Sequence, residues 1–311
     1  MDHESHLKSL AEVAAVKVDP ARRFFSATHE EISAGLTTDI YFVRTYEILQ
    51  KTGRINTPAV AEIFATRPGV MAGVEECLNL LKGRGVEVWA LDEGEPFAEK
   101  EVVMRISGEY GRYGVFETVL LGFLASSSGW AAAARECKQA AGSRRVVCFG
   151  ARHVHPAVAP VMERAAIVGG ADGASCVLGA KLAGIEPSGT VPHTVFLIVG
   201  DTVRVAEEYH RVMPPGSPVI VLVDTFKDEA EESLRVAGAL KENLSAIRLD
   251  TAGERGGVTP GLVREVRARL IQAGYGHVRI VVSGGITPER IPGLLAAGAD
   301  IFGVGSYISG A

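Results

Sequence analysis

The chain has 311 residues with a formal net charge of −5, and 47% of them are hydrophobic. This composition predicts a large folded core, and it argues against a disordered chain and against a general nucleic-acid binder. Four cysteines without a CxxC pair argue against a thiolate zinc site and a disulfide framework. The start is polar, without a signal-peptide core, and no apolar run reaches the length of a membrane span. We therefore expect a soluble cytoplasmic protein with no membrane partner.

Residues 1–33 carry a weak apolar periodicity, which predicts a helical arm. The stretch LTTDIY then begins a helical pattern. Its Thr37, Thr38 and Asp39 are residue types that cap helices, and the residues alone leave a cap and a functional role equally open.

Residues 57–107 differ from the preceding helical pattern and predict an α+β module. Three strand-like runs, TPAVAEIFAT, VEVWAL and EKEVVMRISG, accompany one amphipathic helical run, GVEECLNLLKGRG. Residues 115–141 form a long run of small and apolar residues, which predicts a helix packed closely against another element. These features predict an N-terminal helical arm and α+β domain over residues 1–140.

From residue 144 onward, short apolar runs alternate with helical patterns at a spacing of roughly 30 residues, as in βαβ units. The alternation predicts parallel strands, and their number fits an α/β barrel over residues 141–311 better than an open sheet. The expected strands are VVCF, AAIVGG, TVFLIV, PVIVLVD, AIRLD, VRIVVSGG and DIFGVGS.

Two glycine-rich loops follow the last two expected strands, SGGI at residues 283–286 and FGVGS at residues 302–306. Glycine lets backbone N–H groups approach an anion, and barrels often bind a phosphate at the ends of their last two strands. The loops favour a phosphate site over plain turns, although many different barrel enzymes share this feature.

Charged residues also follow expected strands. Asp224 and Asp250 each end one, where a carboxylate serves either Mg²⁺ and ribose hydroxyls or the cap of the next helix. Arg248 lies two residues before Asp250 and so points to the same side of the strand, which suits a phosphorylated sugar.

Arg152 follows the first expected strand and is a candidate clamp for an anion, because a guanidinium matches a carboxylate with two hydrogen bonds. His153 and His155 have no third ligand nearby in sequence, so we expect no protein-bound metal site. His193 lies beside an expected helix start, and it remains open whether it is structural, a general base or a phosphate-accepting nucleophile.

The order of three motifs, FGARxxxP, AAxxGGxDGxS and AxxxGIxxSGTxxHT, resembles the core of the nicotinate phosphoribosyltransferase family. LTTDIY, IRLD, SGGI and FGVGS resemble further motifs of that family, and AGVEECLNLLKGRGVEVWAL resembles the small domain shared with quinolinate phosphoribosyltransferases. The resemblance covers the chain from about residue 36 to the end and implies a seven-stranded, incomplete TIM-like α/β barrel beside an α+β domain.

The resemblance also implies a reaction in which nicotinate and phosphoribosyl pyrophosphate give nicotinate mononucleotide and pyrophosphate. Mg²⁺ accompanies the phosphoribosyl pyrophosphate, and ATP is a co-substrate. A head-to-tail homodimer is implied, in which Asp39 and Tyr41 complete the partner's site. The small-molecule substrates are the expected partners, without nucleic acid.

Residue by residue, the resemblance implies a ring sandwiched by Phe149 and Tyr41, its carboxylate held by Arg152. Asp172 would face the ring edge and Thr190 would lie near the ring or ribose. The remaining implied roles are a phosphorylated His193 oriented by Asp224, a ribose and pyrophosphate site at Arg248 and Asp250, and a 5′-phosphate loop of Gly284, Gly285, Gly303 and Gly305.

Two alternatives remain. A quinolinate phosphoribosyltransferase would release carbon dioxide and use no ATP, and it would need several basic side chains for a dicarboxylate. A non-catalytic binding paralogue would keep the fold but release no pyrophosphate. The presence of His193, Asp224, Arg248 and Asp250 argues against this second alternative.

Overall fold

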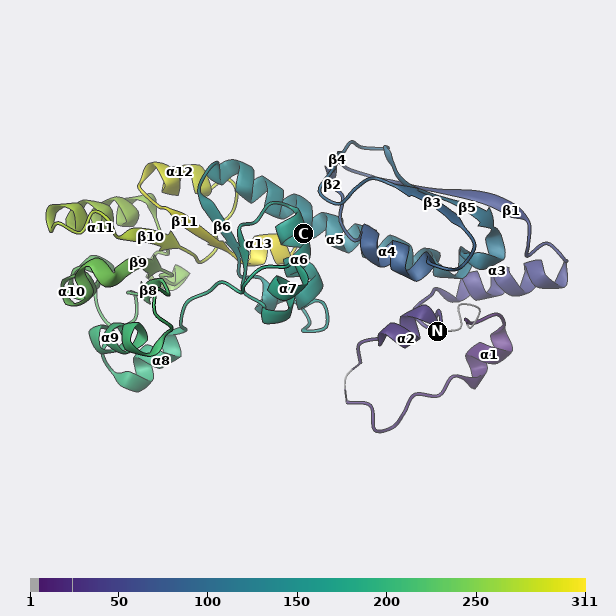
Figure 1. Ribbon diagram of the computed structural model, residues 1–311, viewed down its shortest axis with the longest axis horizontal. Helices are drawn as coiled ribbons and strands as arrows, with labels where there is room; N and C mark the ends of the chain where they lie inside the picture. Colours follow the sequence, from purple (N-terminus) through teal and green to yellow (C-terminus); the bar gives the residue numbers. More distant parts are fainter. Residues whose placement is uncertain (1–5, 24) are drawn as a thin grey trace. The chain divides into compact units, whose positions relative to one another are not determined.

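The computed structural model describes residues 6–23 and 25–311, and the chain forms two compact units, Met1–Ala131 and Ala132–Ala311. Figure 1 traces both units along the chain. The division falls inside the long helix α5 (Glu117–Ala141), while the sequence suggested a boundary after residue 140. Each unit has its own sheet and is described separately.

The N-terminal unit contains a three-stranded antiparallel sheet in the order β1-β5-β3 and a two-stranded sheet of β2 and β4. Along β1 exposed residues alternate with partly buried ones, and the partly buried Ala61 and Ile63 pack against the core of this unit. The strands are β1 (Pro58–Phe64), β2 (Gly69–Val70), β3 (Glu87–Ala90), β4 (Pro96–Phe97) and β5 (Val102–Glu109). The helices are α1 (Leu10–Ala15), α2 (His29–Ser33), α3 (Ile40–Lys51) and α4 (Val74–Leu81), with 3₁₀ turns η1 (Tyr110–Arg112) and η2 (Gly114–Phe116).

The core of this unit contains Met71, Met104, Ile106, Phe116 and Leu120, all at most 1% exposed. The expected α+β module is therefore present. The helical arm is shorter than expected, because only α1 and α2 are helical among the described residues of 1–33. The first five residues of that expected arm and residue 24 lie outside the described residues.

The C-terminal unit is built on six parallel strands in the order β7-β6-β11-β10-β9-β8. The outer strands β7 and β8 are not paired with each other, so the barrel is incomplete, as expected. Val147, Ala246, Val281 and Ile301 pack together as a buried cluster contributed by four different strands. The strands are β6 (Arg145–Cys148), β7 (Gly173–Ala174), β8 (Val219–Leu222), β9 (Leu244–Leu249), β10 (Arg279–Val282) and β11 (Ile301–Val304).

Helices alternate with these strands and pack on the sheet and on one another, with α10 contacting both α9 and α11 (Figure 1). They are α6 (Ala159–Val168), α7 (Val177–Leu182), α8 (His193–Val199), α9 (Thr202–Val212), α10 (Glu229–Leu240), α11 (Pro260–Gln272), α12 (Ile291–Ala296) and α13 (Ser306–Ser309). The 3₁₀ turns are η3 (Ala151–His153), η4 (Lys241–Asn243) and η5 (Gly253–Arg255).

Two of the seven expected strands are helices, and one short strand that was not expected, β7, is present, so the sheet has six strands where the resemblance implied seven. AAIVGG ends α6, where alanines favour a helix and pack in its buried face. TVFLIV lies in α8, between the N-cap Pro192 and the C-cap Gly200, whose φ of +86° ends a helix readily. The periodicity of a short apolar run does not distinguish a strand from a buried helix. In TVFLIV the flanking Pro192 and Gly200 mark the ends of a helix.

One stretch of the described residues, Gly114–Ala141, is long and apolar enough to cross a membrane by length and composition. A helix was expected over residues 115–141, but no apolar run of membrane-spanning length was expected there. Half of its apolar window is buried inside the protein.

Candidate active site

A pocket of about 690 Å³ opens in the C-terminal unit where the strands end. Its walls are the loops after β6, β7, β9, β10 and β11 and the segment that leads into α8. Ligands of parallel α/β folds bind at this edge of the sheet. The lining residues are Phe149, Arg152, His153, Ser175, Pro187, Ser188, Gly189, Thr190, Val191, Pro192, Arg248, Asp250, Ser283, Gly284, Gly285, Gly303, Gly305 and Ser306.

Arg248 connects three walls of this pocket. Its Nη2 donates to Asp250 Oδ2 at 3.0 Å, its Nη1 to Thr190 Oγ1 at 2.8 Å and its Nε to Ser283 Oγ at 2.9 Å. Ser283 Oγ in turn donates to Asp250 Oδ1 at 2.7 Å. The network brings together residues far apart in sequence and presents hydroxyl and carboxylate oxygens beside a guanidinium, a combination suited to a sugar bearing phosphates.

Phe149 forms the aromatic wall, and its ring centroid lies 5.3 Å from the guanidinium carbon of Arg248. Gly303 in β11 makes room for this ring, because a Cβ there would lie 2.4 Å from Phe149 Cε2. Gly303 therefore leaves space for the ring and also lines the pocket. Gly284 and Gly285, with φ of +87° and +62°, adopt a backbone that other residues rarely accept.

Arg152 is on η3 and lines the pocket beside Phe149. Within the described part of the chain no carboxylate pairs with it, so its charge is available to a bound anion. His153 also lines the pocket, and a Cβ on Gly305 would lie 2.7 Å from its Cε1. His153 was not among the predicted site residues.

His193 begins α8, and its Nε2 lies 3.2 Å from Asp224 Oδ1 and 3.3 Å from Oδ2. The side chain of His193 is 43% exposed and that of Asp224 only 3%. Burial raises the pKa of the Asp224 carboxyl above its ordinary value, and the contact with His193 opposes this rise. Arg255 donates from Nη1 to the Asp224 carbonyl at 3.0 Å. A buried acid thus holds one nitrogen of an accessible imidazole.

Asp172 lies elsewhere, which corrects the expectation that it faces a bound ring. Its Oδ2 accepts from the backbone N of Val146 and from Lys138 Nζ, both at 2.8 Å. Val146 is near the start of β6, and Asp172 directly precedes β7, so this carboxylate lies at the amino edge of the sheet, opposite the pocket.

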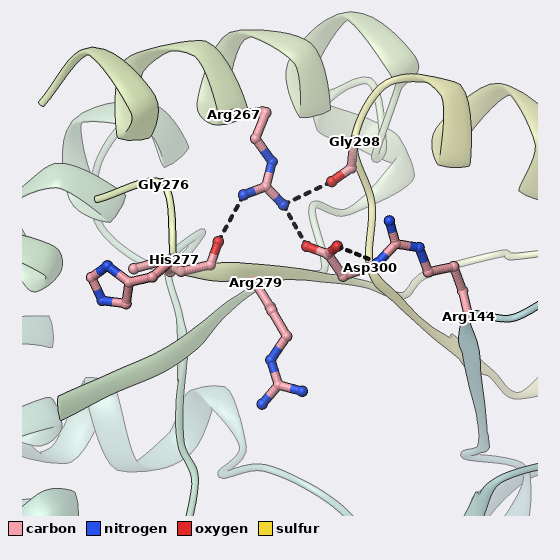
Figure 2. Close-up of a pocket in the computed structure, with 8 residues that line it drawn as sticks. Arg144, Arg267, Gly276, His277, Arg279, Gly298 and Asp300 are labelled. Carbon is pink, nitrogen blue, oxygen red and sulfur yellow. Dashed lines mark hydrogen bonds and ion pairs between the residues drawn. The ribbon is translucent and has the colours of Figure 1, made fainter. Parts of the chain in front are cut away.

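Asp300 repeats this arrangement before β11. Its Oδ2 accepts from the Ile280 N at 2.9 Å, and Arg267 and Arg144 also bind it. Figure 2 shows these side chains in a second pocket, of about 350 Å³, at the amino edge. Arg267 also donates to the carbonyls of Val278 and Gly298, and Arg279 points away from Asp300 (Figure 2). The guanidinium groups that converge here, those of Arg144 and Arg267, are therefore already bound to Asp300. We call such an arrangement, an aspartate bound to a strand amide and to a cation of a neighbouring segment, a structural clasp.

Asp39 and Tyr41 belong to the N-terminal unit. Asp39 is the N-cap residue of α3 without a capping side-chain bond, and its Oδ2 instead accepts from Thr118 Oγ1 at 3.2 Å. Tyr41 is 53% exposed, with its ring centroid 4.2 Å from that of Phe42.

In the part of the chain that the structure describes, no group of three or more His, Cys, Asp or Glu side chains is arranged to hold a metal ion. Mg²⁺ in phosphate chemistry commonly uses one or two carboxylates together with substrate oxygens. Asp250, which lines the pocket, fits that lesser requirement.

Comparison with known proteins identifies the family of the chain. Residues 39–128 match the N-terminal domain of quinolinate phosphoribosyl transferase, and residues 130–311 match its C-terminal domain. The chain belongs to the type II phosphoribosyltransferase family. It is a phosphoribosyltransferase of a family that acts in NAD biosynthesis.

The names of three similar proteins do not all give the same enzyme. A nicotinate phosphoribosyltransferase of Mycobacterium tuberculosis is 28% identical over 93% of this chain and 72% of its own length. The solved structure of a nicotinate-nucleotide pyrophosphorylase from Pyrococcus furiosus is 44% identical, with a TM-score of 0.90 over 93% of this chain and 76% of that one. The human nicotinic acid phosphoribosyltransferase, at 20% identity and a TM-score of 0.69 over 86% of this chain and 72% of that one, shares the fold.

Proposed function

We propose that the chain is a nicotinate phosphoribosyltransferase. It transfers the phosphoribosyl group of phosphoribosyl pyrophosphate to nicotinate, giving nicotinate mononucleotide and pyrophosphate with the help of ATP. The observation that carries the proposal is Arg152, a pocket guanidinium without a carboxylate partner in the described chain, next to the aromatic wall of Phe149. One free cation beside an aromatic ring matches a pyridine with a single carboxylate.

In the proposed reaction the pyridine nitrogen forms a bond to the anomeric carbon of the ribose. The bond from that carbon to the pyrophosphate oxygen breaks, and the pyrophosphate leaves with the electron pair. The pocket accelerates this step by aligning the ring and stabilising charge. Phe149 stacks on the base, Arg248 and Asp250 hold the ribose and pyrophosphate, and Mg²⁺ would neutralise part of the pyrophosphate charge.

The glycine loops are proposed to bind the 5′-phosphate, and Thr190 to lie near the ring or ribose. His193 is proposed to accept a phosphoryl group from ATP. Asp224 holds the proton on Nε2, which leaves the lone pair of Nδ1 as the nucleophile. When the phosphohistidine is hydrolysed, the group departs as inorganic phosphate, and ADP remains from the ATP.

We also propose that the enzyme is soluble, cytoplasmic and a homodimer in which Asp39 and Tyr41 contribute to the partner's site. Support for a dimer comes from apolar side chains exposed on α7 and α8. Val177, Leu178, Leu182, Leu197 and Ile198 are between 54% and 78% exposed.

The second candidate is quinolinate phosphoribosyltransferase, favoured by the name of the Pyrococcus furiosus relative, a nicotinate-nucleotide pyrophosphorylase. Of the basic residues in the pocket, Arg248 is already paired with Asp250, which leaves only Arg152 and His153 for the two carboxylates of quinolinate. That small set favours nicotinate.

The test is pyrophosphate release from phosphoribosyl pyrophosphate and Mg²⁺ with nicotinate, nicotinamide or quinolinate, each with and without ATP. We expect release with nicotinate that ATP increases, and His193→Ala should lose only that increase. Release with quinolinate alone, together with carbon dioxide and without an ATP effect, would assign the second function. Binding without release for every base would indicate a non-catalytic paralogue.

A further inference from the structure

Glu163 on α6 is a fully buried carboxylate outside the pocket, with 0% of its surface exposed. Its Oε1 accepts from the Ala151 N at 3.2 Å and from Ser175 Oγ at 2.8 Å. Its Oε2 accepts from the Cys176 N at 2.5 Å. An ionised carboxylate only accepts hydrogen bonds, so these three donors suit it in a place where an unsatisfied charge would be costly.

The three donors belong to two loops that build the same wall of the pocket. Ala151 precedes Arg152 and is two residues after Phe149, in the loop after β6. Ser175, which lines the pocket, and Cys176 follow β7. Glu163 therefore ties together the two loops at the Phe149 and Arg152 side.

Arg290 has the complementary role on the opposite wall. It donates from Nη1 to the carbonyls of Gly284 and Gly285, and from Nη2 to the Val258 carbonyl at 2.7 Å. In a trans peptide the C=O and N–H groups point in opposite directions. Since both glycine carbonyls face Arg290, the N–H groups of Gly285 and Ile286 in the same peptides face away from it and remain available to an anion.

We propose that Glu163 and Arg290 are positioning residues, each of which sets one half of the pocket: Glu163 the base half and Arg290 the phosphate half. The inference rests on the proposed function for the names of the two substrates. Neither side chain lines the pocket, and each acts through the loops it holds.

The matched variants are Glu163→Gln, which keeps the shape but replaces one acceptor with a donor, and Arg290→Met, which removes the guanidinium. We expect Glu163→Gln to raise the KM for nicotinate about tenfold and to leave the KM for phosphoribosyl pyrophosphate within about twofold. Arg290→Met should show the reverse pattern. A merely structural role would lower Tm and the active fraction while leaving both KM values alone, and that result, or an equal rise of both, overturns the proposal.

Amide hydrogen exchange provides a readout independent of the substrate. In Glu163→Gln the Ala151 and Cys176 amides should exchange faster, while the strand amides of β9 and β10 keep their protection. Ser175→Ala removes one donor without disturbing the carboxylate, so its KM effect should be smaller, about threefold.

These measurements separate the two hypotheses. If the wild type does not use nicotinate, the proposed function fails, yet the exchange experiment still tests Glu163. Unchanged protection of both amides in Glu163→Gln overturns the positioning role for any base. If Glu163→Gln does not fold, the single variants Glu163→Asp and Ser175→Ala are measured by amide exchange and by KM. Normal exchange and normal KM values in both variants would overturn the positioning role of Glu163.

Discussion

The two edges of the six-stranded sheet use the same residue types for different purposes. At the carboxyl edge, Arg248 and Asp250 face a pocket and bind hydroxyl groups of two other loops. At the amino edge, Asp172 and Asp300 each bind the backbone of a neighbouring strand and a cation from a helix, Lys138 or Arg267. An acid–base pair beside a strand therefore indicates function at one edge and a structural clasp at the other.

The largest effect should come from breaking the carboxyl-edge network at its centre. Arg248→Ala removes three hydrogen bonds and leaves Asp250 without its cation, so we expect kcat/KM to fall by about 100-fold to 1,000-fold. Tm should change little, because the side chain faces the pocket. Steady-state kinetics with a parallel thermal melt check this prediction. A large fall in Tm with normal activity in the folded fraction would mean that Arg248 has a structural role like that of the amino-edge pairs.

Asp300→Ala should have the opposite signature. It leaves Arg267 without its acid and the Ile280 N–H without its acceptor, both largely buried, so the free energy of unfolding should fall by about 2 kcal/mol. Urea denaturation measures the loss. Activity per folded molecule should stay within about twofold, and a specific rise of either substrate KM would show that this edge also serves the reaction.

Asp172→Ala should be milder, because Lys138 and Asp172 are 25% and 31% exposed. We expect a loss of about 1 kcal/mol in the free energy of unfolding. The KM for the base should be unchanged. A raised KM for nicotinate at normal stability would restore the ring-edge role that the sequence suggested and would remove the distinction between the two edges.

The smallest effect concerns the buried acid at the carboxyl edge. Burial raises the pKa of Asp224, so the native state holds this proton more tightly than the unfolded state does. The protonated Asp224 therefore adds to the free energy of unfolding at a pH below its unfolded pKa of 3.8. This contribution is lost as the pH rises through the pKa of Asp224 in the native state. Asp224→Asn lacks this loss, so at pH 7 it should unfold at higher urea than the wild type and the advantage should disappear toward pH 4.

The Asn variant should also lose the increase in activity that ATP gives, because the amide no longer orients His193 as the carboxylate does. A variant less stable than the wild type at pH 7, or a difference that does not depend on pH, would mean that the contact with His193 outweighs the cost of burial.

The carboxyl edge was more predictable from sequence than the amino edge for a physical reason. Strand alternation places Arg248 and Asp250 on one side, and the carboxyl ends of parallel strands converge, so a shared place for these two residues at the carboxyl edge was predictable. The hydrogen bond from Arg248 to Thr190 was not predicted. Asp172 follows an apolar run that ends α6 and precedes β7. The run was taken for a strand, which would place Asp172 at a carboxyl end, and the family resemblance implied the same edge; the helix and β7 place it at the other.

Other features had no local signal. Glu163 lies within an ordinary helical pattern, and its three donors come from loops that only the tertiary fold brings to it. His153 was considered for metal binding, whereas its place in the pocket depends on the close approach of Gly305. Such contacts depend on packing between segments far apart in sequence, which periodicity does not report.

The most direct test of the central claim compares nicotinate with nicotinamide as substrates for the wild type and for Arg152→Gln. The account predicts that the wild type prefers nicotinate by about 100-fold in kcat/KM and that the variant loses this preference, with nicotinamide turnover little changed. An equal fall for both bases, or an unchanged preference, would contradict the assignment of the carboxyl-edge pocket to a pyridine carboxylate.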